Sequence, residues 1–196
     1  MKLTQTPSHR ARPGYCEGEV LRLFPGGYPV HIDLAVNDVG GVASGMRFLL
    51  PLNGLNLPLT HQFEHKLIIA LRGQLQVRRG RHLIATLHEG TGVVVSPGTA
   101  HRIAQHGEAE SVVGVVLWPG SVEQAFRAIA EQVATVGADR AAMKAILADY
   151  GVVWDQATAT PSRGAVLKPQ PAAQALSALP APVFNAVDNH LKHWLG

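Results

Sequence analysis

Residues 60–73 read THQFEHKLIIALRG, and residues 90–101 read GTGVVVSPGTAH. Each stretch sets histidine beside a short, continuously apolar run that is rich in Val or Ile and bounded by glycine. Such runs are too short to span a membrane and are typical of buried β-strands. The two stretches therefore predict a small site of imidazole side chains held on strands.

Short strand-like segments, separated by turn signals, continue outward from these two stretches. They cover residues 20–24, 30–36, 46–50, 66–77, 82–87, 92–95, 101–104 and 111–117. Many short strands over about a hundred residues predict a β-sandwich or β-barrel. We expect a loose lead-in over residues 1–18 and a barrel over residues 19–118.

Helical patterns replace the strand patterns after residue 120. Ser121 and Gln124 have the spacing of a capping box, which predicts that a helix begins there. Asp139 is expected to cap a second helix, and each of the two helices is followed by a glycine that can end it. We expect this pair, within residues 119–155, to cover an open end of the barrel.

The remaining residues, 156–196, divide into two parts. Residues 156–182 are rich in Ala, Pro, Thr and Ser, a composition that predicts a linker or a surface loop. Val183, Val187 and Leu191 then recur at helical spacing. They predict a terminal amphipathic helix that docks on the barrel or on a second subunit.

The composition indicates a globular protein. Of 196 residues 46% are hydrophobic and 16% are charged, the net charge is only +3, and the single cysteine, Cys16, excludes an internal disulfide framework. No amino-terminal signal and no membrane-spanning run is visible, so we expect a soluble, cytoplasmic protein without a membrane partner. The second helix offers only Arg140 and Lys144 to phosphates, so we expect no nucleic-acid partner.

The later of the two opening stretches has a recognisable spacing. The pattern Gly90-x5-Ser96-x-Gly98-x2-His101 resembles the second sequence motif of the cupin superfamily, with Ser96 where proline is usual. The segment from Trp118 to Val152 is similar to the tail of single-domain quercetin-dioxygenase-like cupins. The resemblance implies a mainly β fold, the cupin double-stranded β-helix or jelly-roll barrel, with C-terminal α-helices.

The first cupin motif matches in two alternative registers. The gap-free register places Thr60, Gln62 and Lys66 at the family's ligand positions, and none of these is the usual metal ligand. A register shifted by one residue places His61 and His65 there, with a β-bulge before Gly73 to absorb the shift.

In the shifted register His61, His65 and His101 would form a three-histidine site that suits divalent Fe, Zn or Ni. Glu64 has three possible roles: a fourth ligand, a partner that orients an imidazole, or an exposed carboxylate. On a regular strand its side chain would face away from His61 and His65, so we expect it to be exposed.

The two registers support different functions. The three-histidine site favours a metal-dependent, dioxygenase-like enzyme acting on a small organic molecule. The gap-free register favours a metal-free or metal-vestigial cupin that binds a small ligand without turning it over.

In either case Gln62 and Lys66 are expected to hydrogen-bond the substrate or ligand. Phe48, Ile68 and Val115 are candidates for the apolar lining. The resemblance also implies a homodimer.

Overall fold

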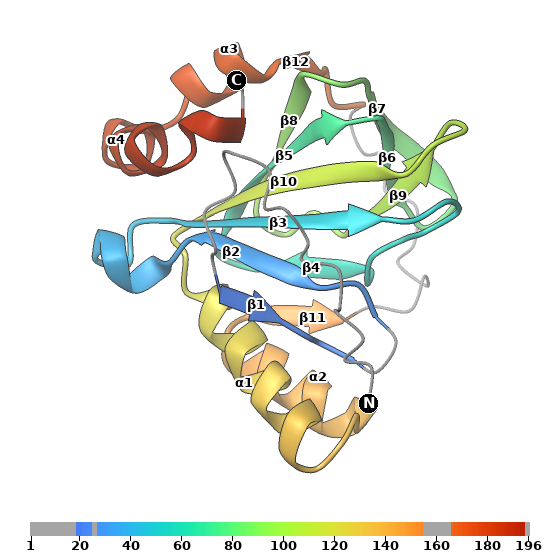
Figure 1. Cartoon of the computed structure of the whole chain (residues 1–196), viewed down its shortest axis with the longest axis vertical. Helices are drawn as coiled ribbons and strands as arrows, with labels where there is room; N and C mark the ends of the chain where they lie inside the picture. Colours follow the sequence, from blue (N-terminus) through green and yellow to red (C-terminus); the bar gives the residue numbers. More distant parts are fainter. Residues whose placement is uncertain (1–18, 25–26, 155–165, 195–196) are drawn as a thin grey trace, which may run out of the picture.

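The computed structural model describes residues 19–24, 27–154 and 166–194. Antiparallel strands close around one interior, and two groups of helices flank them (Figure 1). The predicted fold, a mainly β barrel followed by α-helices, is confirmed. The predicted lead-in, residues 1–18, lies outside the described residues, as do residue 155 and residues 156–165 of the Pro/Ala-rich segment.

The barrel strands follow one another closely along the chain. They are β1 (Glu19–Leu21), β2 (Val30–Leu34), β3 (Ser44–Leu50), β4 (Leu59–His61), β5 (His65–Arg72), β6 (Gln74–Arg79), β7 (His82–Leu87), β8 (Thr91–Val95), β9 (Arg102–His106) and β10 (Ser111–Trp118). The largest sheet has the order β1-β2-β3-β10-β5-β8-β12, in which β12 is Gln170–Pro171. A second sheet has the order β7-β6-β9, and β4 pairs with β11 (Val152–Trp154).

Strand β5 lies in the middle of the largest sheet, between β10 and β8. Its side chains alternate between two buried faces, because successive residues of a strand point to opposite sides of the sheet. Ile68 and Ala70 belong to the core inside the barrel. Leu67 and Ile69 belong to a second core on the outer face. A strand buried on both faces explains the continuous apolar run in the sequence.

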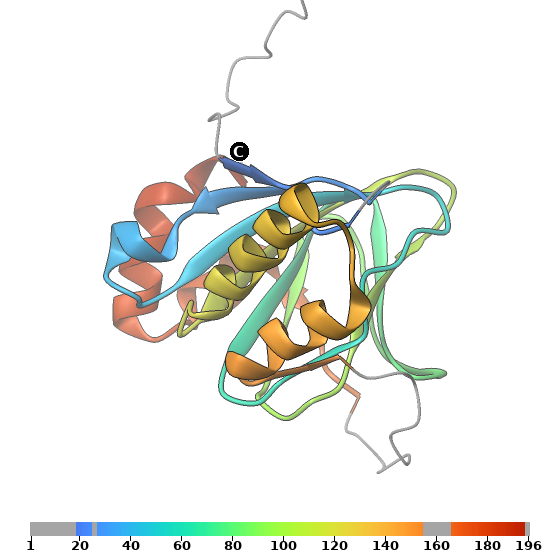
Figure 2. The same ribbon diagram turned by 90° about the horizontal axis from the view of Figure 1, so that it is seen from below.

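The predicted helix pair lies across one end of the barrel (Figure 2). It consists of α1 (Val122–Thr135) and α2 (Arg140–Asp149). Val122, Ile129 and Leu147 of these helices join the core inside the barrel. The Asp139 carboxylate accepts a hydrogen bond from the Ala141 N–H, which confirms the predicted cap of α2.

The predicted capping box of α1 is wrong. Ser121 makes no side-chain bond to its own helix. Its hydroxyl donates instead to Glu64, and the Val122 N–H donates to the same carboxylate. A carboxylate from the distant connection between β4 and β5 thus replaces the local cap. The spacing of Ser121 and Gln124 does not reveal this replacement.

The C-terminal segment packs on the outer face of the largest sheet. The predicted amphipathic helix is confirmed as α4 (Ala181–His190), which docks on the barrel, and the short 3-10 turn η2 (Lys192–Trp194) follows it. The loop predicted before it is wrong over α3 (Ala172–Ser177). Pro171 and Pro180 immediately precede helices, a position that tolerates proline because no intrahelical N–H bond is lost there.

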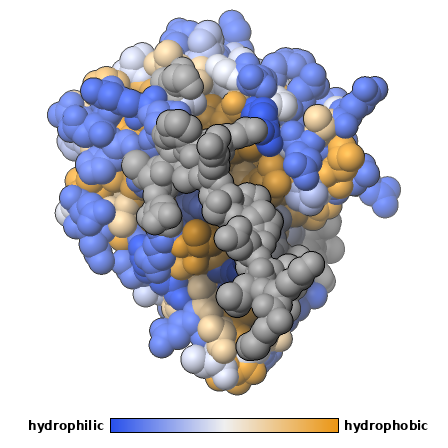
Figure 3. All heavy atoms as spheres, in the orientation of Figure 1, coloured by the Kyte–Doolittle hydropathy of each residue, from blue (hydrophilic) through white to orange (hydrophobic). Residues whose placement is uncertain are grey.

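Polar and apolar residues share the surface. Hydrophilic residues cover most of the outline of the face in Figure 3, and hydrophobic residues show in its middle. Within residues 19–24, 27–154 and 166–194, no helix has the length and apolar character to cross a membrane.

Candidate functional site

Two buried imidazoles lie side by side inside the barrel. His61 ends β4, and His101 immediately precedes β9. Their ring centroids are 6.0 Å apart with the ring planes 25° from parallel, and the two residues are only 3% and 4% exposed. The backbones of Leu59 and His101 pair through an isolated β-bridge, which holds the two segments together. This pairing joins the two stretches singled out in the sequence.

Each imidazole turns its Nδ1 atom toward an acceptor. His61 Nδ1 is 3.0 Å from Glu64 Oε2, and His101 Nδ1 is 2.8 Å from the Thr99 carbonyl oxygen. Burial, together with a smaller effect of the nearby Lys66, lowers the pKa of His61 well below its usual value and that of His101 to about 3. Both rings are therefore neutral at pH 7. The Thr99 carbonyl assigns the ring proton of His101 to Nδ1, and the ionised form of Glu64 does the same for His61.

The opposite nitrogens of the two rings have no hydrogen-bond partner among the described residues. Both Nε2 atoms are buried. A neutral ring that is protonated on Nδ1 carries its lone pair on Nε2. The site therefore presents two buried nitrogen lone pairs, which a metal ion or a hydrogen-bond donor could use.

Glu64 connects this pair to helix α1. It is 2% exposed, so the prediction that it faces solvent is wrong. The chain bends at Gln62 and Phe63 instead of continuing as a strand, which turns the carboxylate inward. Its Oε2 faces His61, while Oε1 accepts the Val122 N–H at 2.8 Å. Burial raises its pKa to about 7, against the opposing effect of these hydrogen bonds.

Lys66 is the buried cation of the site. It lies on the inner face of β5 and is 4% exposed. Burial lowers its pKa to about 8, and the Glu64 carboxylate partly opposes this change. No described residue forms a hydrogen bond or an ion pair with the Lys66 ammonium group. A buried ammonium without such contacts is costly and is typical of functional sites.

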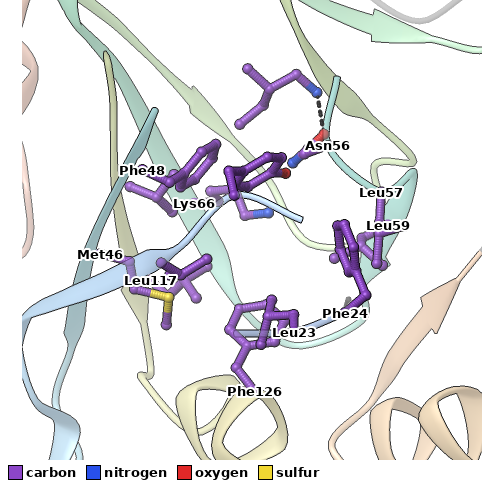
Figure 4. A pocket seen from close by; sticks show the side chains of 14 residues that line it. Leu23, Phe24, Met46, Phe48, Asn56, Leu57, Leu59, Lys66, Leu117 and Phe126 are labelled. Atoms are coloured by element: carbon purple, nitrogen blue, oxygen red, sulfur yellow. Dashed lines mark hydrogen bonds between the residues drawn. The ribbon is translucent and has the colours of Figure 1, made fainter. Parts of the chain in front are cut away.

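Next to Lys66 the barrel contains a partly open cavity with a volume of about 60 Å³. This volume has room for several water molecules or for part of a small organic molecule, since a cavity that binds benzene measures about 150 Å³. Figure 4 shows the Lys66 nitrogen pointing toward the middle of the cavity, among apolar side chains. The lining consists of Leu23, Phe24, Tyr28, Val30, Met46, Phe48, Asn56, Leu57, Leu59, Lys66, Ile103, Val115, Leu117 and Phe126.

The other candidate residues do not all lie at the cavity. Phe48 and Val115 line the cavity, whereas Ile68 is wholly buried in the core and is not part of the lining. Gln62 is exposed. His65 lies on the outer side of β5, where its ring stacks on Trp118 at 5.3 Å between centroids.

The sequence reasoning did not find Asn56, Tyr28 or Phe126 as lining residues. Phe126 lies within the first of the two predicted helices. Asn56 follows a turn and Tyr28 follows a Pro-Gly-Gly segment, so neither lies in a pattern that indicates burial. Only the closure of the barrel brings them to Lys66.

The observed arrangement combines the two predicted registers. His61 faces inward as in the shifted register, and Lys66 faces inward as in the gap-free one. Within the part of the chain that the structure describes, no three His, Cys, Asp or Glu side chains are grouped to hold a metal ion. The two Nε2 atoms fit a metal, but the third side chain beside them is an amine in place of His65.

Comparisons with known proteins concern the barrel. No protein-family model matches the chain, and no curated protein is significantly similar to it. Among solved structures, the chain is similar to an RmlC-like cupin from Shewanella frigidimarina, with 13% identity over 62% of this chain and 99% of the other and a TM-score of 0.45.

Two further structures have a similar degree of likeness. A cupin 2 conserved barrel domain protein from Salinispora arenicola has 15% identity over 63% and 98% of the two chains, with a TM-score of 0.43. A protein with a double-stranded β-helix domain from Klebsiella pneumoniae has 16% identity over 51% and 84%, with a TM-score of 0.44. A likeness of this degree does not extend to substrate, metal or reaction.

Proposed function

We propose that the protein is a metal-free cupin that binds a small organic molecule in the barrel cavity. The observation that carries this proposal is the cavity beside Lys66, whose ammonium group has no partner among the described residues. Small-molecule sites are mostly apolar hollows with a few polar groups that orient the ligand. This cavity has that character, with one cation among mainly apolar side chains.

Filling the cavity tests the proposal. Val115 is 5% exposed and lines the cavity, so Val115→Trp should fill it and abolish binding of small probes such as hexanamide and benzamide. Val153→Trp is the matched control, because Val153 is 38% exposed on β11. Binding is measured by ligand-observed NMR at pH 7. Equal binding to both variants would place the probes outside the barrel and contradict the proposal.

A second candidate function is a metal-dependent, dioxygenase-like enzyme. The observation in its favour is the pair of buried Nε2 lone pairs, each on a ring oriented by an acceptor at Nδ1. Metal-binding histidines commonly have such a partner on the other ring nitrogen. His61 and His101 would hold a divalent Fe, Zn or Ni ion, which when bound polarises a substrate oxygen.

Elemental analysis separates the two candidates. We expect less than stoichiometric Fe, Zn and Ni in protein purified without chelators, both in the wild type and in His101→Ala. His82→Ala serves as control, because His82 is exposed on β7. A stoichiometric metal in the wild type and in His82→Ala that is lost in His101→Ala would favour the enzyme over the metal-free protein.

A further inference from the structure

We propose that the molecule bound beside Lys66 is a small carboxylic acid, held as its anion by Lys66 and Asn56. This inference rests on the proposed function and adds the chemical class of the ligand. It follows from the polar side chains that line the cavity, because each of them can donate a hydrogen bond.

Lys66 provides the charge. An ammonium group has three N–H donors and no acceptor, and burial without a counter-charge is unfavourable. Its nitrogen points into the cavity (Figure 4). With a pKa of about 8 it remains largely protonated at pH 7. A ligand oxygen that carries negative charge would satisfy it best.

The nearest protein carboxylate is already engaged. Glu64 Oε2 faces His61 Nδ1, and Glu64 Oε1 accepts both the Ser121 hydroxyl and the Val122 N–H. No ion pair joins Glu64 to the Lys66 ammonium group. The Glu64 charge therefore acts on Lys66 only at a distance, and the ammonium hydrogens remain for a ligand.

Asn56 provides a neutral donor. Its Oδ1 accepts the Ile103 backbone N–H at 2.6 Å, which fixes the orientation of the amide, since an N–H cannot face an NH₂ group. In Figure 4 this hydrogen bond lies on the side of Asn56 that faces away from the cavity. The side-chain nitrogen of Asn56 lies on the side that faces the cavity. No described residue accepts a hydrogen bond from this nitrogen.

Tyr28 is the other polar side chain of the lining. Burial raises its pKa, so the phenol keeps its proton and can donate. The lining therefore includes no carboxylate, and each of its three polar side chains can donate a hydrogen bond. Two or three donors that converge on one space fit the oxygens of a carboxylate better than an amine or a second cation.

The rest of the lining indicates an apolar body for the acid. Phe24, Phe48 and Phe126 surround the space, and the Tyr28 ring stacks on Phe48 at 5.2 Å between centroids. An aliphatic chain or an aromatic ring would be buried against these side chains. We therefore infer a small aliphatic or aromatic monocarboxylate.

Isosteric pairs of probes test the class of ligand. Hexanoate and benzoate are compared with hexanamide and benzamide by calorimetry at pH 7. The amides match the acids in shape but lack the charge. We expect each acid to bind the wild type at least about tenfold more tightly than its amide.

Two variants assign this preference to the cavity. Lys66→Met should remove the preference, because it keeps the length of the side chain without the charge. Lys144→Met should retain it, because Lys144 is exposed on α2 and the change in net charge is the same. Asn56→Asp should also weaken binding of the acids. The new carboxylate keeps one oxygen toward the Ile103 N–H and adds a negative charge that repels the anionic ligand. Thermal unfolding of each variant verifies that it is folded.

The outcomes separate this inference from the proposed function. Amides that bind as tightly as acids, or an acid preference that persists in folded Lys66→Met, would overturn the inference and leave a small-molecule cavity. Absence of binding by all four probes to the wild type would count against both.

Discussion

At the scale of single residues, the main feature is a lysine on the inner face of a strand. The sequence suggests this position, because the gap-free cupin register places Lys66 where the family has a metal ligand. It could not reveal that His61 faces the same interior, since residues five apart do not share a face of a regular strand. The bend at Gln62 and Phe63 allows both His61 and Lys66 to face the interior, and no local turn signal predicts this bend.

Buried charge at Lys66 should make the stability of the protein depend on pH in an unusual way. The folded-state pKa of about 8 lies below the ordinary value of 10.5, so the unfolded chain binds more protons between these values. Stability therefore rises as the pH increases from about 8 to 10.5, because the folded protein no longer has to bury a charged Lys66. We expect a gain on the order of 3 kcal/mol, relative to Lys66→Met.

Urea unfolding of both proteins between pH 8 and 10.5 measures this difference. In this range the His101 and His61 rings stay neutral, and Glu64, with a pKa of about 7, is already mostly ionised, so the change with pH reports on Lys66. The buried Tyr28 titrates above its ordinary value. A pH-independent difference between the two proteins would mean that Lys66 is not buried as an ammonium in the folded state.

At the scale of elements, one carboxylate joins a strand connection to the start of a helix. Glu64 follows β4 and caps the first turn of α1, fifty-eight residues later in the chain. An anionic acceptor is favourable there, because the first N–H groups of a helix lack partners within it. The start of α1 could be predicted from the sequence, but its capping group could not, because the two lie far apart in the chain.

Replacing Glu64 by glutamine should move a proton on His61. The glutamine oxygen is expected to stay with the two donors, the Val122 N–H and the Ser121 hydroxyl. Its amide then donates to His61 Nδ1, and the ring proton must move to Nε2. Nitrogen NMR shifts of the imidazoles in Glu64→Gln report this exchange of tautomer.

His101 is the internal control for that measurement. Its Nδ1 donates to the Thr99 carbonyl oxygen, which the substitution does not touch. The tautomer of His101 should therefore be the same in both proteins. A His61 ring that keeps its proton on Nδ1 in the variant would show that Glu64 does not determine the tautomer.

At the scale of the whole molecule, the barrel was predictable and the placement of its covering helices was less so. Period-2 and continuous apolar runs predict the strands because each strand buries one or two faces. The prolines at 171 and 180 indicate a loop in the sequence, yet they begin helices whose apolar side chains cover the sheet. Composition alone does not distinguish these two uses of proline. The expected homodimer remains a prediction.

The cover that α3 and α4 place over the largest sheet has a mechanical consequence. Strand β5 is packed from behind by this second core and faces the cavity with Lys66 on its other side. A densely packed layer resists deformation, so this wall cannot bow outward around a bulky guest. Extra room therefore has to come from another part of the lining, such as the end of the barrel where Phe126 of α1 borders the cavity. The rigid wall behind β5 would thus limit the width of any guest that the barrel can accommodate.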